Sequence, residues 1–300
     1  MISPPYLVPG DSIAIIATAR KVSEEEMKPA IEILEKAGLT VELGGNIFNK
    51  ENQYSGSDEE RLNDLQWALD DETIKAVIIA RGGYGTVRLI DKVDFSLFQK
   101  NPKWIIGYSD VTVLHSHINA HFQTATLHAT MPINFLKNEE ATQSLLNALQ
   151  GKLNSYSFEP HSLNRNGKAE GVLVGGNLSL LYALAASPSD INTNGKILFI
   201  EDLDEYYYHI DRMMINLKRS GKLKDLKGLI VGGMTEMKDN AIPFGKNSEE
   251  IILDSVKEYD YPVCFNFPAG HVDRNLAFYL GKKCELNVTN SDSSIVFFEK

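Results

Sequence analysis

Short apolar runs alternate with amphipathic stretches through the first half of the chain. The apolar runs have the length of buried strands and occupy residues 12–18, 39–43, 74–80 and 104–107. The stretches between them have the apolar spacing of helices and occupy residues 24–37, 58–71 and 110–122. Strands that alternate with helices are typical of a parallel sheet covered on both faces. The first half therefore predicts an α/β domain, with ligands at the carboxyl ends of its strands.

The pattern becomes less regular beyond residue 136. Residues 137–168 are rich in Asn, Ser and Gly around one helical segment, which predicts a linker region. Strand-like and helical stretches follow it without regular alternation. We therefore expect an N-terminal α/β domain over 1–136, a linker over 137–168 and a C-terminal domain of mixed strands and helices over 169–300.

Composition and charge narrow the choice of partners. The 300 residues include 40 Asp and Glu against 30 Lys and Arg, a formal net charge of −10. An acidic chain is poorly suited to nucleic-acid phosphates or to an anionic membrane surface, so we expect a small molecule or peptide as partner. No apolar run approaches the roughly 20 residues of a membrane helix, and the N-terminus lacks the regions of a secretory signal. Cys264 and Cys284 lie in separate strand-like runs and predict buried thiols in a reducing, cytoplasmic compartment.

The segment GYSD at 107–110 places a serine where a predicted strand gives way to a helix. Serine is a common helix N-cap. A serine on a sharp strand-to-helix turn is also how many hydrolases expose a nucleophile. Position 111 is valine, so the second glycine of the G-x-S-x-G motif is missing. On this segment alone, both interpretations of Ser109 stay open.

A serine hydrolase also needs backbone N–H groups directed at the developing oxyanion. The N–H of Asp110 follows the serine at a helix N-terminus, and the turn RGGYG at 81–85 ends the preceding predicted strand. Glycines let backbone approach a ligand closely, which makes Gly82 and Gly83 candidates for the second donor. The turn matches neither G-x-G-x-x-G nor a P-loop. A plain tight turn or an anion-binding turn is the alternative.

The chain has seven histidines that could serve as the base. His271 follows a glycine on a predicted loop, and His128 ends a predicted strand, so both fit this role. His117 and His121 stand four residues apart on a predicted helix, a spacing that suits a metal. Because no third ligand is evident, we expect no metal site there.

An acid is needed to orient the histidine. A cluster of four carboxylates within 201–205 follows the apolar run KILFI. Glu201 comes directly after this run and is best placed to project from a strand end. Asp204 and Glu205 are expected to lie in a solvent-exposed loop. These residues would give the chain order Ser, Glu, His.

Five segments in order resemble the LD-carboxypeptidase family of serine peptidases, which also includes microcin-C immunity peptidases. They are RGGYGTVRLID, GYSDVT, GGNLSLL, ILFIEDLDE with YHIDRMM, and GH before YLG. The resemblance covers about residues 5–285. It implies a doubly wound, flavodoxin-like N-terminal domain with a parallel sheet and a C-terminal mixed β/α domain. It also implies a catalytic triad in the cleft between these domains, and a homodimer.

Residue by residue, the resemblance implies Ser109 as nucleophile, Glu201 as acid and His271 as base, with oxyanion donors at Asp110 and at Gly82–Gly83. It implies a cytoplasmic serine carboxypeptidase, without metal or organic cofactor, that cleaves an L–D peptide bond. Its substrate would be a murein tetrapeptide that loses its C-terminal D-alanine during cell-wall recycling. The alternatives are a microcin-C-type immunity peptidase that cleaves a peptidyl-nucleotide toxin, and a non-catalytic module that binds small ligands.

A carboxypeptidase has to recognise a terminal carboxylate, which takes a cation or a nest of N–H groups. Arg81, beside the glycine turn, and Arg274, three residues beyond His271, are the nearest candidates in sequence. Both could equally be ordinary surface arginines. The chain departs from the family at 128–130, which often reads His-Gly-Pro, and at 278–281, which often reads Leu-Pro-Ile-Gly. These departures leave the detail of the substrate open.

Overall fold

The computed structural model describes residues 1–298, and the chain divides into two compact units. The first unit comprises Met1–Leu153 and Asp273–Tyr279, and the second comprises Asn154–Val272 and the chain from Leu280 onward. The first division lies inside the stretch expected as a linker. That stretch carries helix α5 (Glu139–Leu149) in the first unit and strand β6 (Ser155–Phe158) in the second.

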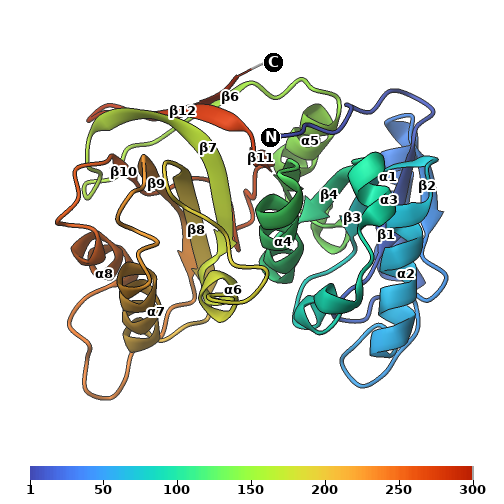
Figure 1. Cartoon of the computed structure of the whole chain (residues 1–300), viewed down its shortest axis with the longest axis horizontal. Coiled ribbons are helices and arrows are strands. Elements are labelled where there is room, and N and C mark those ends of the chain that lie inside the picture. Colours follow the sequence, from blue (N-terminus) through green and yellow to red (C-terminus); the bar gives the residue numbers. More distant parts are fainter. Residues whose placement is uncertain (299–300) are drawn as a thin grey trace. The chain divides into compact units, whose positions relative to one another are not determined.

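A six-stranded sheet forms the centre of the first unit (Figure 1). Its strands are β1 (Ser12–Ile16), β2 (Thr40–Leu43), β3 (Ile74–Ile79), β4 (Trp104–Gly107), β5 (Thr126–His128) and β11 (Phe278–Leu280). They lie in the order β11-β5-β4-β3-β1-β2, and β1 to β5 pair in parallel. The order 2-1-3-4-5 is that of flavodoxin-like, doubly wound sheets. The predicted fold class of the N-terminal domain is therefore confirmed.

Helices and short 3₁₀ turns connect these strands. The helices are α1 (Glu24–Lys36), α2 (Asp58–Asp70), α3 (Ser96–Lys100), α4 (Thr112–Phe122) and α5, and the turns are Thr86–Arg88, Ile90–Lys92, Ser109–Val111 and Pro132–Asn134. Both α1 and α2 begin at complete capping boxes, formed by Ser23 with Glu26 and by Ser57 with Glu60. Strands β1, β3 and β4 are buried along almost their whole length, as expected where helices cover both faces.

The second unit contains a seven-stranded mixed sheet in the order β10-β9-β8-β7-β12-β13-β6. Its further strands are β7 (Gly167–Asn177), β8 (Ile197–Leu203), β9 (Gly228–Thr235), β10 (Val263–Cys264), β12 (Lys283–Val288) and β13 (Ser293–Phe297). Strands β7 to β10 pair in parallel, whereas β7, β12, β13 and β6 pair antiparallel. This unit is the mixed β/α domain that the resemblance implies.

The helices of the second unit are α6 (Leu178–Ala183), α7 (Tyr207–Arg219) and α8 (Ser248–Ser255). Buried side chains of α7 and α8, such as Met214 and Ile252, join those of β8 and β9, such as Leu198 and Leu229, in one core. This packing fixes β8, the strand that carries the candidate acid Glu201 near its end. Within residues 1–298, no helix combines the length and the apolar character needed to cross a bilayer.

Candidate active site

Ser109 lies two residues after the end of β4, on a strained turn. Its φ is +63°, a left-handed conformation that costs a residue other than glycine about 1–3 kcal/mol. The N-cap of α4 is Val111 and that of the preceding 3₁₀ turn is Tyr108, so Ser109 takes neither capping position. A half-buried serine with positive φ between a parallel strand and a helix has the geometry of a nucleophile elbow. This geometry favours the chemical interpretation of Ser109.

Gly107 and Val111 explain how the turn forms without the second glycine of the motif. A β-carbon on Gly107 would lie only 2.7 Å from Cγ2 of Val111. The φ of Gly107 is +149°. His115 fixes the same residue, because its Nε2 donates to the Gly107 carbonyl at 2.9 Å. Burial lowers the pKa of His115 to about 4, so the ring is neutral at pH 7. The valine and the histidine therefore hold the strand end that precedes Ser109.

The glycine turn after β3 lies against the Ser109 side chain. A β-carbon on Gly82 would lie 3.2 Å from Cβ and 3.3 Å from Oγ of Ser109. Strands β3 and β4 pair in parallel, so the residues after them meet at one edge of the sheet. The structure therefore brings together Ser109, its neighbour Asp110 and Gly82, which the sequence analysis expected to lie close together.

The carboxylate of Asp110 ties the glycine turn to the elbow. Its Oδ2 accepts hydrogen bonds from the N–H of Thr86 at 2.9 Å and from the Thr86 hydroxyl at 2.6 Å. The Thr86 hydroxyl also lies 2.7 Å from that of Thr18, which follows β1. Burial raises the pKa of Asp110 above its usual range. The sequence analysis considered only the backbone N–H of Asp110 and missed this network, which joins the ends of three strands.

In the second unit, Glu201 and His271 form a close pair. The Nδ1 of His271 lies 2.7 Å from Oε2 of Glu201, and the backbone N–H of His271 donates to the same oxygen at 3.1 Å. The Glu201 side chain is fully buried, whereas the His271 side chain is 15% exposed. The Thr235 hydroxyl donates to the His271 carbonyl at 3.0 Å. These contacts hold the ring through Nδ1. In a serine hydrolase, Nε2 is then the nitrogen that exchanges a proton with the serine.

Glu201 also sets the proton affinity of His271. Burial lowers the pKa of the imidazole, but the negative charge and hydrogen bond of Glu201 outweigh this effect, so the pKa is raised above 6.5. Asp202 adds to the same negative field. A histidine with a raised pKa is a stronger base once it is neutral.

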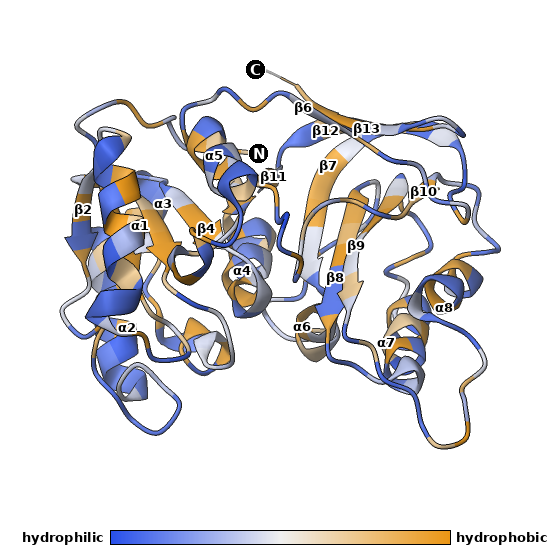
Figure 2. Ribbon diagram, turned by 180° about the vertical axis from the view of Figure 1, so that it is seen from behind, coloured by the Kyte–Doolittle hydropathy of each residue, from blue (hydrophilic) through white to orange (hydrophobic). Residues whose placement is uncertain are grey.

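Asp202 is a second buried carboxylate at the end of β8 that the sequence analysis did not single out. It accepts hydrogen bonds from Nδ2 of Asn177 and from the N–H groups of Ser179 and Leu203, at 2.8–2.9 Å. Burial and the charge of Glu201 raise the pKa of Asp202 to about 7. Figure 2 shows the change along β8 from hydrophobic orange to hydrophilic blue. Buried acids are rare without a specific reason, which makes this strand end a candidate functional site.

The remaining histidine candidates lie in other surroundings. The Nε2 of His128 is 3.1 Å from Oδ1 of Asn275, and its ring stacks on Phe278. The rings of His117 and His121 lie 4.5 Å apart, and burial lowers the pKa of His117 to about 4. In the described part of the chain, no three His, Cys, Asp or Glu side chains form a group that could hold a metal ion.

The two arginine candidates differ. The guanidinium of Arg274 donates to both carboxylate oxygens of Glu140 at 2.7 Å, so its charge is already matched. Arg81 is half-buried beside the glycine turn.

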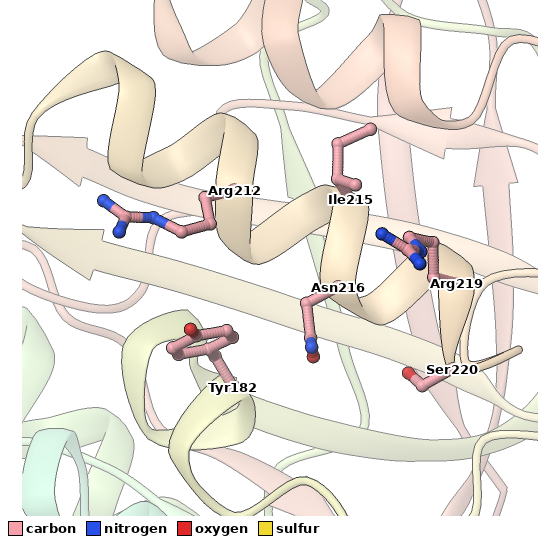
Figure 3. A pocket seen from close by; sticks show the side chains of 6 residues that line it. All are labelled: Tyr182, Arg212, Ile215, Asn216, Arg219 and Ser220. Carbon is pink, nitrogen blue, oxygen red and sulfur yellow. The ribbon is translucent and has the colours of Figure 1, made fainter.

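A groove of about 490 Å³ lies between α6 and α7, and none of the candidate site residues lines it (Figure 3).

Comparisons with known proteins show the family of the chain. The LD-carboxypeptidase N-terminal domain matches residues 13–129, and the LD-carboxypeptidase C-terminal domain matches residues 170–286. The "Probable murein peptide carboxypeptidase" of Bacillus subtilis (strain 168) is 36% identical over 302 residues, which cover 97% of this chain and 93% of that protein.

Two solved structures illustrate the similarity of fold. The crystal structure of muramoyltetrapeptide carboxypeptidase from Oxalobacter formigenes has a TM-score of 0.86 at 27% identity and covers 96% of this chain and 99% of that one. MccF in complex with glutamyl sulfamoyl guanosine has a TM-score of 0.87 at 22% identity and covers 98% of both chains. At 22% identity, the second similarity concerns the fold alone.

Proposed function

Because the chain belongs to the LD-carboxypeptidase family of serine peptidases, we propose that it removes the C-terminal D-alanine from murein tetrapeptides. The single observation that carries the proposal is the left-handed φ of Ser109 in contact with the Gly82 turn. A strained serine next to a backbone turn is an arrangement that hydrolases use for acyl transfer. The substrate class rests on the murein peptides named for the relatives at 36% and 27% identity.

In the proposed mechanism, Ser109, Glu201 and His271 act as one unit. Nε2 of His271 takes the proton of the Ser109 hydroxyl while Oγ bonds to the carbonyl carbon of the L–D peptide bond. Glu201 holds Nδ1, which keeps the proton-accepting nitrogen at Nε2. The N–H groups of Asp110 and of the Gly82–Gly83 turn stabilise the oxyanion.

The intermediate then collapses and the C–N bond breaks. His271 gives its proton to the departing amine, so that D-alanine leaves with a neutral amino group and the peptide stays bound to Ser109 as an ester. A water molecule, deprotonated by the same histidine, attacks this ester and regenerates the serine. Every proton in this cycle passes through Nε2 of His271.

We further propose that the enzyme works in the cytoplasm as a homodimer. The buried thiols of Cys264 and Cys284 are unpaired, as is usual in a reducing compartment. The dimer rests on the family resemblance. Light scattering on the purified chain tests it, since a molar mass near the 33.4 kDa of one chain would contradict it.

The substrate assignment is tested by offering the purified protein two compounds at equal concentration. One is the tetrapeptide L-Ala-γ-D-Glu-L-Lys-D-Ala, and the other is a glutamyl sulfamoyl nucleoside, the class of ligand bound to MccF. We expect release of D-alanine from the tetrapeptide and no cleavage of the second compound. Cleavage of the sulfamoyl compound alone would contradict the proposal and favour an immunity peptidase.

A further inference from the structure

Arg20 is an arginine that the sequence gives no reason to select, and the fold places it at the candidate site. It follows β1, and a short two-stranded bridge holds its backbone. The N–H of Ser55 donates to the Ala19 carbonyl, and the N–H of Lys21 donates to the Gln53 carbonyl, both at 3.1 Å. Arg20 itself bridges to Tyr54. These hydrogen bonds fix the backbone of Arg20, from which its side chain extends.

The Arg20 side chain occupies the space beside Gly83. A β-carbon on Gly83 would lie 2.6 Å from Cγ, 2.8 Å from Cδ and 3.2 Å from Nε of Arg20. Gly83 has a φ of +127°, so both its backbone and its surroundings require glycine. The aliphatic part of the Arg20 side chain thus packs against Gly83, and Nε of the guanidinium group lies beside the turn.

The charge of Arg20 is not matched by an acid. Arg61 and Arg88, which also lie near this turn in the chain or in space, both bind the carboxylate of Asp58. Across residues 1–298, Arg20 forms no ion pair within 4.0 Å, and its guanidinium makes no hydrogen bond. In a chain with a net charge of −10, an anionic substrate needs such a local cation.

Gly82, the neighbour of Gly83, is in contact with Ser109. Consecutive α-carbons lie about 3.8 Å apart, so the guanidinium of Arg20 begins one residue from the glycine that contacts the candidate nucleophile. We propose that Arg20 binds a carboxylate of the substrate and sets the preference of the enzyme for anionic peptides. The inference rests on the proposed function, because it takes the murein tetrapeptide as the ligand.

The test compares Arg20→Gln with Lys21→Gln. Lys21 is an exposed neighbour of equal charge whose Nζ donates to the Asn52 carbonyl. Because a hydrogen bond to a charged group contributes about 1.5–3 kcal/mol, we expect Arg20→Gln to raise KM for the tetrapeptide about 10- to 100-fold. Lys21→Gln should leave KM within about twofold, and Arg20→Lys should recover part of the loss. In each variant kcat should change little, because the contact is equally present in the ground and transition states.

Two modified peptides identify the carboxylate. One carries a C-terminal amide, and the other carries an amide in place of the α-carboxylate of the D-glutamyl residue. The peptide that lacks the partner of Arg20 should show the same KM with the unaltered enzyme and with Arg20→Gln, while the other keeps the difference. Equal KM values for Arg20→Gln and Lys21→Gln on the intact tetrapeptide would overturn the role of Arg20 and leave the proposed function standing. Failure of the unaltered enzyme to cleave any of the peptides would overturn the proposed function and this inference with it.

Discussion

Gly270 and Glu201 are so close that no side chain fits at position 270. A β-carbon there would lie 2.6 Å from Oε2 of Glu201, the oxygen that accepts both hydrogen bonds from His271. The φ of Gly270 is +105°, which further requires glycine. The glycine before the candidate base is therefore what allows the acid to reach it.

We expect Gly270→Ala to behave like a loss of Glu201. The methyl group must displace the carboxylate from His271, so kcat should fall by roughly 10³-fold or more, although residue 270 contributes no reacting atom. The control is Gly245→Ala, in the same unit, where φ is +86° but no atom lies within 4 Å of the added carbon. Steady-state kinetics on both variants decide the matter, and equal activity of the two would contradict the proposed role of Glu201.

Replacing Ser109 should separate stability from activity. Ser109→Ala and Ser109→Gly should both lose nearly all turnover, by about 10⁴-fold. Ser109→Gly should also be more stable than Ser109→Ala by about 1 kcal/mol, because glycine relieves the left-handed strain. Thermal unfolding measures this difference. Gln123→Gly, at φ +49° after α4, should gain stability while it keeps activity. A Ser109→Gly variant no more stable than Ser109→Ala would mean that the turn is unstrained.

The pH dependence should follow His271. The imidazole acts as a base only when neutral, and its pKa is raised above 6.5, so kcat/KM should fall as the pH drops through that raised value. Glu201→Gln removes the charge that raises the pKa and leaves burial, which lowers it. The residual activity of this variant should therefore have its acid limb at lower pH than the unaltered enzyme. A limb that stays in place, or moves to higher pH, would show that His271 is not the titrating base.

The network of Thr18, Thr86 and Asp110 should support both stability and turnover. Thr86→Val keeps the shape but leaves the buried carboxylate of Asp110 without its 2.6 Å hydrogen bond, which should cost about 1–3 kcal/mol. It should lower kcat more than it raises KM, since the turn that carries Gly82 is anchored there. Thr86→Ser restores the hydroxyl and should restore both quantities. Loss of activity in the serine variant equal to that in the valine variant would assign the effect to packing alone.

Much of the first unit follows from local patterns. The apolar runs of β1, β3 and β4 and the helical spacing of α1 and α2 are signals within a few residues, and the structure has these elements where they were expected. Glu201 could also be selected, since it directly follows the apolar run of β8. Burial at a strand end is a local consequence of such a run.

Other features depend on contacts between distant segments. Strand β11 has three residues, too few for any period, and it joins the first sheet beside β5, which lies about 150 positions earlier. Arg20 was missed because its significance depends on packing against Gly83, more than 60 positions away. Asp202 stood in an acidic stretch that resembles a solvated loop, and its burial and three hydrogen bonds distinguish it from the exposed Asp204.

The central claim is that Ser109 cleaves a bond to a C-terminal D-residue, and one paired measurement tests it most directly. The protein is incubated with two tetrapeptides that differ only in ending with Lys–D-Ala or Lys–L-Ala, and released alanine is quantified for the unaltered enzyme and for Ser109→Ala. A site that fixes the carbonyl, the oxyanion direction and the terminal carboxylate leaves room for the side chain on one face only. We therefore expect D-alanine from the first peptide, little or no alanine from the second, and neither product from the Ser109→Ala variant. Equal release from both peptides, or undiminished release by Ser109→Ala, would contradict the account.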